Sequence, residues 1–303
     1  MALGYDKPLY ILAFDHRGSF KKPFGFTGDL SSEDRDRLSD GKMLIYEGVQ
    51  QALADGAPRE AAGILVDEEF GADILRQARK EGVVFAMPAE KSGQDEFDFE
   101  YGEDFGAHIE EFDPTFVKVL VRYNPEGDAE LNARQTERLK RLSDWLHGND
   151  RKFLFELLVP AEPGQLEAVG GDEDRYDAGV RPGLMLGTIA ALQKGGVEPD
   201  IWKIEGIDAR EDCMRIAEQA RSGGRGGVAC VVLGRGADDD KVAHWLRMGA
   251  GVPGYLGFAI GRTIWNPPLK AFLAGELDRP AAAKAIGDNY RKFIDVWESA
   301  SAS

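Results

Sequence analysis

Eight apolar runs rich in β-branched residues recur along this 303-residue chain, and segments with helical spacing separate them. Runs of this kind are typical of parallel strands buried on both faces, and a helix after each strand is the usual return crossover. The repeat predicts a (β/α)8 TIM barrel with an extra C-terminal helix, formed by residues 1–303 as a single domain. The expected strands are residues 9–15, 62–69, 83–89, 116–123, 153–160, 200–206, 228–234 and 254–260.

An open doubly wound sheet is the competing architecture for a chain of this length. Such a fold usually has fewer strand–helix units and a change of composition between its halves, and this sequence shows no such change. The tail over residues 280–298 carries apolar residues at helical spacing. We expect it to pack outside the ring or against a partner subunit, which would give a homo-oligomer. Other helices are expected at residues 72–81, 129–146, 181–194, 210–221 and 239–248.

The charge balance narrows the choice of partners. The chain has 53 acidic and 37 basic residues, a formal net charge of -16, which repels nucleic acid and anionic membranes. We therefore expect neither as a partner, and an anionic small molecule must be held by a local cluster of basic groups. The sequence has no signal-type apolar run and no stretch of membrane-spanning length, so we expect a cytoplasmic protein. The two cysteines lack the spacing of a metal site, and we expect no metal or other cofactor.

Charged residues interrupt the apolar runs near the ends of several expected strands. In barrel enzymes the catalytic groups lie at the C-terminal ends of the strands, because the loops there form the mouth of the site. Lys203 and Glu205 are two residues apart on the sixth expected strand and therefore share one face. Lys118 and Glu156 lie on the fourth and fifth. We predict that these groups meet at the mouth.

A lysine in such a place suits covalent chemistry on a carbonyl group. Partial burial and a nearby cation such as Lys118 are expected to lower the pKa of Lys203 and make it an amine nucleophile. The resulting iminium is an electron sink that lets a neighbouring carbon–carbon bond break without a metal. Glu156 is predicted to carry protons to the carbinolamine, and Asp15 to orient the substrate hydroxyls or the lysine. His16 is expected to point away from Asp15 along the first strand and to play a supporting part.

Two glycine–arginine loops follow the last two expected strands. Gly234, Arg235 and Gly236 come after the seventh strand, and Gly261 and Arg262 come after the eighth. In this fold these two loops commonly bind phosphate through backbone N–H groups. Glycine lets the backbone approach the anion, and arginine adds a bidentate contact, so we predict a phosphate site here. The other residues predicted to bind substrate are Arg17 and Glu205.

Each of these residues also has a structural explanation. A lone lysine at a strand end is more often a surface residue, and Glu156 could be a purely structural partner of a buried lysine. Asp15 could cap the following turn. Asp67 and Glu69 could hold a divalent cation in a metal-dependent lyase, although no further ligand lies at a suitable spacing. A barrel can also keep its phosphate loops without any chemistry, as a non-catalytic sugar-phosphate-binding protein.

Five motifs occur in order along the chain. They are Asp15-His16-Arg17-Gly18-Ser19, Gly63-Ile64-Leu65-Val66-Asp67-Glu68-Glu69-Phe70-Gly71, Val117-Lys118-Val119-Leu120, Phe155-Glu156-Leu157 and Trp202-Lys203-Ile204-Glu205. Together they resemble the tagatose 1,6-bisphosphate aldolase family of class I aldolases. They are still more similar to the aldolase-like domain that is fused to 5-dehydro-2-deoxygluconokinase in inositol catabolism. The resemblance covers nearly the whole chain.

The resemblance implies a reaction and a role for several residues. Lys203 corresponds to the Schiff-base lysine of the family, and Lys118 and Glu156 correspond to residues that line the site. Arg262 corresponds to the arginine that binds phosphate. The implied reaction is the cleavage of a phosphorylated ketose or keto-acid to dihydroxyacetone phosphate and an aldehyde.

Two departures bear on the implied substrate. His16 stands where the tagatose enzymes have Gln, and Glu68 stands where they have Pro. Both differences favour the inositol-type domain, so 2-deoxy-5-keto-gluconate 6-phosphate is the first substrate to try and tagatose 1,6-bisphosphate the second.

Overall fold

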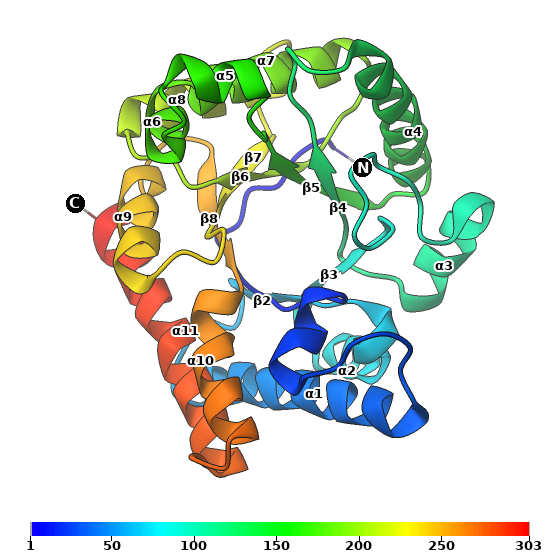
Figure 1. Ribbon diagram of the computed structural model, residues 1–303, viewed down its shortest axis with the longest axis vertical. Helices are drawn as coiled ribbons and strands as arrows, with labels where there is room; N and C mark the ends of the chain where they lie inside the picture. Colours follow the sequence, from blue (N-terminus) through cyan, green and yellow to red (C-terminus); the bar gives the residue numbers. More distant parts are fainter. Residues whose placement is uncertain (1, 303) are drawn as a thin grey trace.

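The computed structural model describes residues 2–302, and its centre is a closed barrel of eight parallel strands in sequential order. β1 pairs with both β2 and β8, which closes the ring and confirms the predicted fold. Figure 1 looks down the barrel and shows the helices arranged around it. The strands are β1 Leu9–Ala13, β2 Ala62–Leu65, β3 Val84–Pro88, β4 Phe116–Arg122, β5 Lys152–Leu158, β6 Ile201–Glu205, β7 Ala229–Leu233 and β8 Tyr255–Ile260.

Helices connect the strands on the outside of the ring. The expected helices are all present, and their ends differ from the predicted ones by a few residues. The α-helices are α1 Ser32–Ala54, α2 Glu68–Glu81, α3 Phe105–Phe112, α4 Ala129–Gly148, α5 Pro163–Ala168, α6 Glu173–Gly179, α7 Arg181–Lys194, α8 Arg210–Ala220, α9 Asp239–Gly249, α10 Arg262–Leu273 and α11 Arg279–Ser301. Two short 3-10 helices, η1 Ser19–Phe24 and η2 Gly102–Asp104, complete the set.

The first two strands end earlier than predicted. β2 stops at Leu65, because Asp67 begins α2 by accepting a hydrogen bond from the backbone N–H of Phe70 at 3.0 Å. β1 stops at Ala13, so the residues that follow belong to a loop. The charged residues that were predicted at the ends of these two strands therefore lie on a helix or a loop instead.

Two apolar cores separate the inside of the barrel from its outer shell. The inner core is small and draws on alternate residues of the strands, such as Leu9, Ile11 and Ala13 of β1. The larger core fills the space between the strands and the ring of helices. Because the inner core occupies the lower barrel, the next inward-facing positions along β4, β5 and β6 are free to carry polar groups.

The predicted C-terminal helix is α11, and its apolar face is covered within the chain. Figure 1 shows α11 beside α10 and running across the end of α1. Gly48 of α1 lets Ile286 approach so closely that an added Cβ would meet Ile286 Cγ2 at 2.5 Å. Tyr290 is fully buried and donates a hydrogen bond to the carbonyl of Tyr10. The helix therefore packs outside the ring, as predicted. Because its apolar face is already covered within the chain, this face does not support a homo-oligomer, which stays a prediction.

At the N-terminal end of the strands, one buried carboxylate connects several elements. Asp200, just before β6, accepts hydrogen bonds from the backbone N–H groups of Gly4 at 2.7 Å and Phe153 at 2.8 Å. It also pairs with Lys152 at 2.8 Å and lies 3.3 Å from His147 Nε2. These contacts join the N-terminal segment to β5 and α4. Within residues 2–302 no helix is long and apolar enough to cross a membrane.

Candidate active site

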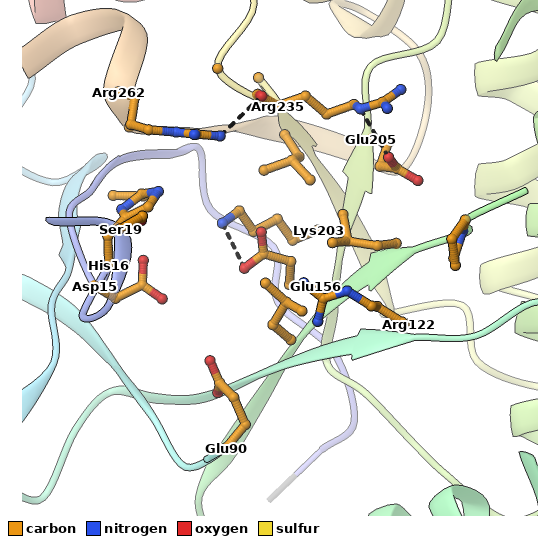
Figure 2. Close-up of a pocket in the computed structure, with 18 of the residues that line it drawn as sticks. Asp15, His16, Ser19, Glu90, Arg122, Glu156, Lys203, Glu205, Arg235 and Arg262 are labelled. Carbon is orange, nitrogen blue, oxygen red and sulfur yellow. Dashed lines mark hydrogen bonds and ion pairs between the residues drawn. The ribbon is translucent and has the colours of Figure 1, made fainter. Parts of the chain in front are cut away.

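The C-terminal ends of the strands surround a cavity of about 730 Å³. Figure 2 shows Lys203 near its centre, with Arg262 on one side and Glu90 on the other. The structure brings all the residues predicted from the sequence to this one cavity. They are Asp15, Arg17, Lys118, Glu156, Lys203, Glu205, Gly234, Arg235, Gly236, Gly261 and Arg262.

Lys203 and Glu156 form a buried pair at the centre. The parallel pairing of β5 and β6 places Glu156 directly beside Lys203, with Nζ of the lysine 2.9 Å from Oε2 of the carboxylate. Burial would raise the pKa of Glu156, but the positive charges of Lys118 and Lys203 outweigh it and hold this pKa below its usual value. Glu156 is thus held as a carboxylate in direct contact with the lysine.

Lys118 occupies a different environment from Lys203. Its Nζ lies 2.8 Å from Asp15, 2.8 Å from Glu90 and 3.0 Å from Glu156. Burial would lower the pKa of Lys118, but these three carboxylates raise it well above its usual value. Lys118 therefore stays charged and holds the three carboxylates in place.

Glu90 is the principal site residue to which the sequence assigned no catalytic or binding role. It follows β3, and its position continues the inward-facing series of Ala86 and Pro88 at intervals of two. This two-residue spacing is the sequence feature from which Glu90 could have been predicted to face the cavity. Burial raises the pKa of the Glu90 carboxyl, with Lys118 opposing the shift in part.

The loop after β1 carries Asp15 and His16, and both line the cavity. The expectation that His16 lies on the first strand is wrong, because β1 ends at Ala13 and the alternation of a strand no longer applies to Asp15 and His16. Burial lowers the pKa of His16 to about 4, with Asp15 opposing the shift, so the ring is neutral at pH 7. Asp15 is partly buried, which would raise its pKa, yet Lys118 and Lys203 hold this pKa well below the usual range.

A buried lysine of α1 supports this loop from below. Lys42 Nζ donates hydrogen bonds to the carbonyls of Phe14 at 2.9 Å and His16 at 3.0 Å, and it also pairs with Asp67. Both charged side chains are fully buried. Lys42 was not predicted, and it explains how the loop keeps Asp15 facing the cavity.

Arg17 is held by protein groups. Its guanidinium donates a hydrogen bond to the carbonyl of Glu90 at 2.7 Å and pairs with Glu100 at 3.1 Å. Only 6% of the residue is exposed. Arg17 thus fixes the loop that carries Glu90, and its predicted contact with substrate stays a prediction.

Glu205 and Arg235 form a second charged cluster at the rim. Glu205 accepts a hydrogen bond from the backbone N–H of Val159 at 2.9 Å and lies 3.2 Å from Arg235 and 3.6 Å from Arg181. Arg235 also pairs with Asp177 of α6. Burial raises the pKa of Glu205, and the positive charge of Arg181 opposes the shift. Glu205 therefore holds Arg235 in place beside the cavity.

Arg262 is the open cation of the two predicted phosphate loops. It begins α10 and donates a hydrogen bond to the carbonyl of Arg235 at 3.1 Å. In the described chain, residues 2–302, no carboxylate lies within ion-pair distance of it. Gly236 has φ 75°, and an added Cβ there would lie 2.8 Å from the Arg262 guanidinium. The backbone conformation favours glycine here, and a larger residue would also require the Arg262 guanidinium to shift.

The acidic residues of the second motif do not form a metal site. Asp67 pairs with Lys42 and caps α2, and Glu69 pairs with Arg35 on the surface. Across residues 2–302 no group of three or more His, Cys, Asp or Glu side chains is arranged to hold a metal ion. The alternative in which Asp67 and Glu69 bind a cation together therefore has no geometric support.

Comparison with known proteins places the chain in a family. The bacterial family described as "Uncharacterized protein conserved in bacteria (DUF2090)" matches residues 4–301. This chain belongs to that family. The match extends from the segment before β1 into α11, so the barrel as a whole is the DUF2090 unit.

Two tagatose 1,6-diphosphate aldolases are similar in sequence to this DUF2090 protein. The tagatose 1,6-diphosphate aldolase of Listeria monocytogenes is 28% identical over 200 residues, covering 64% of this chain and 54% of the relative. Tagatose 1,6-diphosphate aldolase 2 of Streptococcus pyogenes is 25% identical over 162 residues, covering 52% of this chain and 46% of the relative. The chain thus matches about half the length of each relative, and the tagatose aldolase resemblance is confirmed at this level.

Solved structures share the fold. A fructose-bisphosphate aldolase from Plasmodium falciparum has a TM-score of 0.68 at 11% sequence identity, covering 96% of this chain and 90% of that one. A protein from Corynebacterium glutamicum has a TM-score of 0.55 at 18% identity, covering 96% and 88%. Both likenesses show that the DUF2090 chain has a barrel of this architecture.

Proposed function

We propose that this protein is a class I, Schiff-base aldolase that cleaves a phosphorylated ketose or keto-acid to dihydroxyacetone phosphate and an aldehyde. The observation that carries the proposal is the difference between the two buried lysines at the mouth. Lys118 contacts three carboxylates and stays charged. Among residues 2–302, Lys203 lies within ion-pair distance of Glu156 alone. The names of the Listeria and Streptococcus relatives support the same class of reaction.

The first half of the reaction forms the covalent intermediate. Lys203 gives a proton to Glu156 across 2.9 Å and attacks the substrate carbonyl carbon as a neutral amine. The carbonyl oxygen takes a proton from the attacking nitrogen and becomes the hydroxyl of a carbinolamine. Glu156 then returns its proton to that hydroxyl, which leaves as water, and a positively charged iminium remains on Lys203.

The second half breaks the carbon–carbon bond. Glu156, again ionised, takes the proton of the hydroxyl on the second carbon beyond the iminium. The bond between the first and second carbons breaks, the aldehyde leaves, and the electron pair neutralises the iminium to give an enamine. Glu156 next protonates the first carbon, and addition of water releases dihydroxyacetone phosphate and Lys203. Asp15, fixed by Lys118, orients the substrate hydroxyls.

We propose that the phosphate group of the substrate binds at the side of the cavity formed by β7 and β8. Arg262 supplies a cation without a carboxylate partner in residues 2–302, and its position at the N-terminus of α10 adds backbone N–H groups. The flexible glycines at 234, 236 and 261 let the two loops approach the anion. This arrangement supports a substrate with phosphate on the side of β7 and β8.

Trapping with borohydride tests the proposal. Reduction in the presence of dihydroxyacetone phosphate, followed by peptide mass spectrometry, should place the adduct on Lys203. The Lys203→Arg variant keeps the charge but not the nucleophilic amine, and it should form no adduct. An unmodified Lys203 in the wild-type protein would rule out the mechanism. Thermal stabilisation by the ligand with neither adduct nor product would identify a sugar-phosphate-binding protein instead.

The substrate itself is found by a panel of phosphorylated sugars. Release of dihydroxyacetone phosphate is measured first with 2-deoxy-5-keto-gluconate 6-phosphate, the substrate that would connect the protein to inositol catabolism, and then with tagatose 1,6-bisphosphate. Activity should survive exhaustive chelation, because the proposed steps use only side chains of the chain. Loss of activity that a divalent cation restores would identify a metal-dependent lyase.

A further inference from the structure

Arg122 is a second arginine of the cavity wall that lacks a carboxylate partner. It is the last residue of β4, and it shares the inward face of that strand with Lys118 and Leu120. Its Nη1 donates a hydrogen bond to the carbonyl of Gln94 at 2.7 Å. Within residues 2–302 no carboxylate lies within ion-pair distance of its guanidinium. Arg122 thus brings to the cavity a positive charge that the described part of the protein does not neutralise.

The guanidinium of Arg122 also keeps hydrogen-bond donors for a ligand. The bond from Nη1 uses one of its N–H groups, whereas Nε and Nη2 donate to no group among residues 2–302. Both atoms are accessible, because neither is among the occluded polar atoms of the residues that the structure describes. An arginine with open N–H groups is suited to a carboxylate or a phosphate, which accepts hydrogen bonds through more than one oxygen.

The charges around Arg122 favour an anion beside it. Glu90 and Glu156 lie on the elements that flank β4, and both carboxylates are bound to Lys118 and to one further cation each. The loop that accepts the hydrogen bond of Arg122 also carries Lys91, an exposed lysine that lines the cavity. Within residues 2–302 Lys91 has no carboxylate partner either. An anionic group here would therefore meet one unpaired arginine and a second positive charge on the adjacent loop.

The order of the strands places Arg122 and Arg262 on opposite sides of Lys203. In this closed ring of eight sequential strands, β4 and β8 face each other across the barrel and β6 lies midway between them. Figure 2 shows Arg122 on the other side of Lys203 from Arg262. Glu156 pairs with Lys203 on β6 and with Leu120 on β4, so Arg122 lies two residues nearer to the mouth. A ligand bound to Lys203 can thus extend one end toward each arginine.

We infer that Arg122 binds a second anionic group of the substrate, at the end of the half that is released as the aldehyde. This inference rests on the proposed function, in which phosphate lies beside Arg262 and the carbonyl carbon is bound to Lys203. The substrate class is then a chain with a phosphate at one end and a phosphate or carboxylate at the other. Tagatose 1,6-bisphosphate and 2-deoxy-5-keto-gluconate 6-phosphate both belong to this class. A ketose monophosphate, which releases a neutral aldehyde, is disfavoured.

The test is the condensation of dihydroxyacetone phosphate with two matched pairs of aldehydes. Glyceraldehyde 3-phosphate and glyceraldehyde differ by a terminal phosphate, and 3-oxopropanoate and propanal differ by a terminal carboxylate. For the wild-type protein we expect kcat/KM for the anionic member of at least one pair to exceed that for its neutral partner by at least about tenfold. The pair that shows this preference identifies the anion as a phosphate or a carboxylate. Absence of the preference in both pairs would overturn the inference.

Two variants assign the preference to Arg122. Arg122→Gln keeps a hydrogen-bond donor on the side chain and removes the charge, so the ratio of kcat/KM between the anionic and the neutral aldehyde should fall by at least about tenfold. Arg122→Lys keeps the charge without the planar fork, and its ratio should lie between those of Arg122→Gln and the wild type. A purely structural effect lowers both members of a pair alike. An unchanged ratio in both variants would therefore overturn the inference.

A matched control and a separate readout complete the design. Arg138 of α4 donates a hydrogen bond to the carbonyl of Phe97 at 2.8 Å, on the same loop after β3, and it does not line the cavity. Arg138→Gln should therefore leave the aldehyde ratios unchanged, and a fall as large as that in Arg122→Gln would overturn the inference. Borohydride trapping of dihydroxyacetone phosphate on Lys203 involves no aldehyde. If trapping fails, the proposed function fails; if trapping succeeds and the ratios do not depend on Arg122, only the role of Arg122 is rejected.

Discussion

At the scale of the residue, two lysines at one cavity differ through their neighbours. Lys118 and Lys203 are both almost fully buried and both touch Glu156. Lys118 has two further carboxylate partners, Asp15 and Glu90, which keep it protonated and turn it into a fixed cation. Among residues 2–302, Lys203 has Glu156 as its single carboxylate partner. The number of partners, which a sequence does not reveal, is thus the basis for proposing an electrostatic role for Lys118 and a nucleophilic role for Lys203.

Replacing Glu156 with glutamine tests its role in proton transfer. Glu156→Gln keeps the size and hydrogen-bonding oxygen of the side chain but cannot carry a proton. We expect kcat for cleavage to fall by about 10²–10⁴-fold, the usual contribution of a general acid–base group. The measurement is release of dihydroxyacetone phosphate under saturating substrate. The control is Glu198→Gln, a variant of a partly buried residue that pairs with Arg225 and does not line the cavity. An unchanged kcat in Glu156→Gln would exclude the proposed proton transfers.

His16 should make the stability of the protein depend on pH. Burial lowers its pKa in the folded state from 6.5 to about 4, so between these values the unfolded chain binds more protons. The stabilising contribution is complete above pH 6.5 and is lost as the pH falls toward 4. Between pH 6.5 and 4, the free energy of unfolding should therefore fall by roughly 1–3 kcal/mol less in the His16→Gln variant than in the wild type. Urea unfolding at several pH values measures it, and parallel curves for the two proteins would contradict the prediction.

At the scale of the element, hydrophobic period predicted most of the architecture. Strands with alternating inward positions place Lys118, Glu156 and Lys203 in the cavity, as expected from their spacing. The rule does not apply where a strand has ended, which is why strand spacing could not predict the orientation of His16. The alternation of inward positions could also have predicted that Glu90 faces the cavity. However, no neighbour of this isolated carboxylate in the sequence indicates that its partner is Lys118.

The first helix shows what pattern could not predict. The buried face of α1 includes Gly41, Lys42 and Gly48, which interrupt the apolar period that identifies a helix facing a core. Their presence depends on tertiary contacts: Gly48 admits Ile286, and Lys42 reaches the loop after β1. The roles of these residues could not be predicted from the sequence of the helix, because they depend on contacts with elements that are distant along the chain.

The pair of Lys42 and Asp67 should be essential to this junction of α1, α2 and the loop after β1. Lys42→Met leaves a buried carboxylate without its cation and should lower the free energy of unfolding by about 3–5 kcal/mol. Adding Asp67→Asn removes that charge while keeping a residue that caps α2, so the double variant should recover part of the loss. Denaturant unfolding of both single variants and the double variant gives the coupling. Additive losses would show that the two side chains do not interact.

At the scale of the whole molecule, the candidate site and a cluster of structural hydrogen bonds lie at opposite ends of the barrel axis. β6 carries Lys203 and Glu205 toward the mouth, and Asp200 precedes the same strand at the base. The charges at the mouth leave groups open to a ligand. Asp200, by contrast, is fully buried and is satisfied by the backbone of Gly4 and Phe153 and by Lys152 and His147.

Asp200→Asn should therefore reduce stability without changing catalysis. An amide cannot accept all of these hydrogen bonds, and we expect the free energy of unfolding at pH 7 to fall by about 2–4 kcal/mol. Burial would raise the pKa of Asp200, but hydrogen bonds from His147, Lys152 and the backbone outweigh it and lower this pKa. The contribution is thus present above the unfolded pKa of 3.8 and is lost as the pH falls below it, so the gap between variant and wild type should narrow in acid.

The matched experiment compares this base variant with one at the mouth. Asp200→Asn should keep kcat within about twofold of the wild type below its melting temperature, since in barrel enzymes residues at the base contribute to stability and residues at the mouth to catalysis. Glu156→Gln should show the reverse, a large loss of kcat with a smaller change in melting temperature. If Asp200→Asn instead lowered kcat while its unfolding curve stayed in place, the two ends of the barrel would be coupled through β6, and the division of labour along the axis would be wrong.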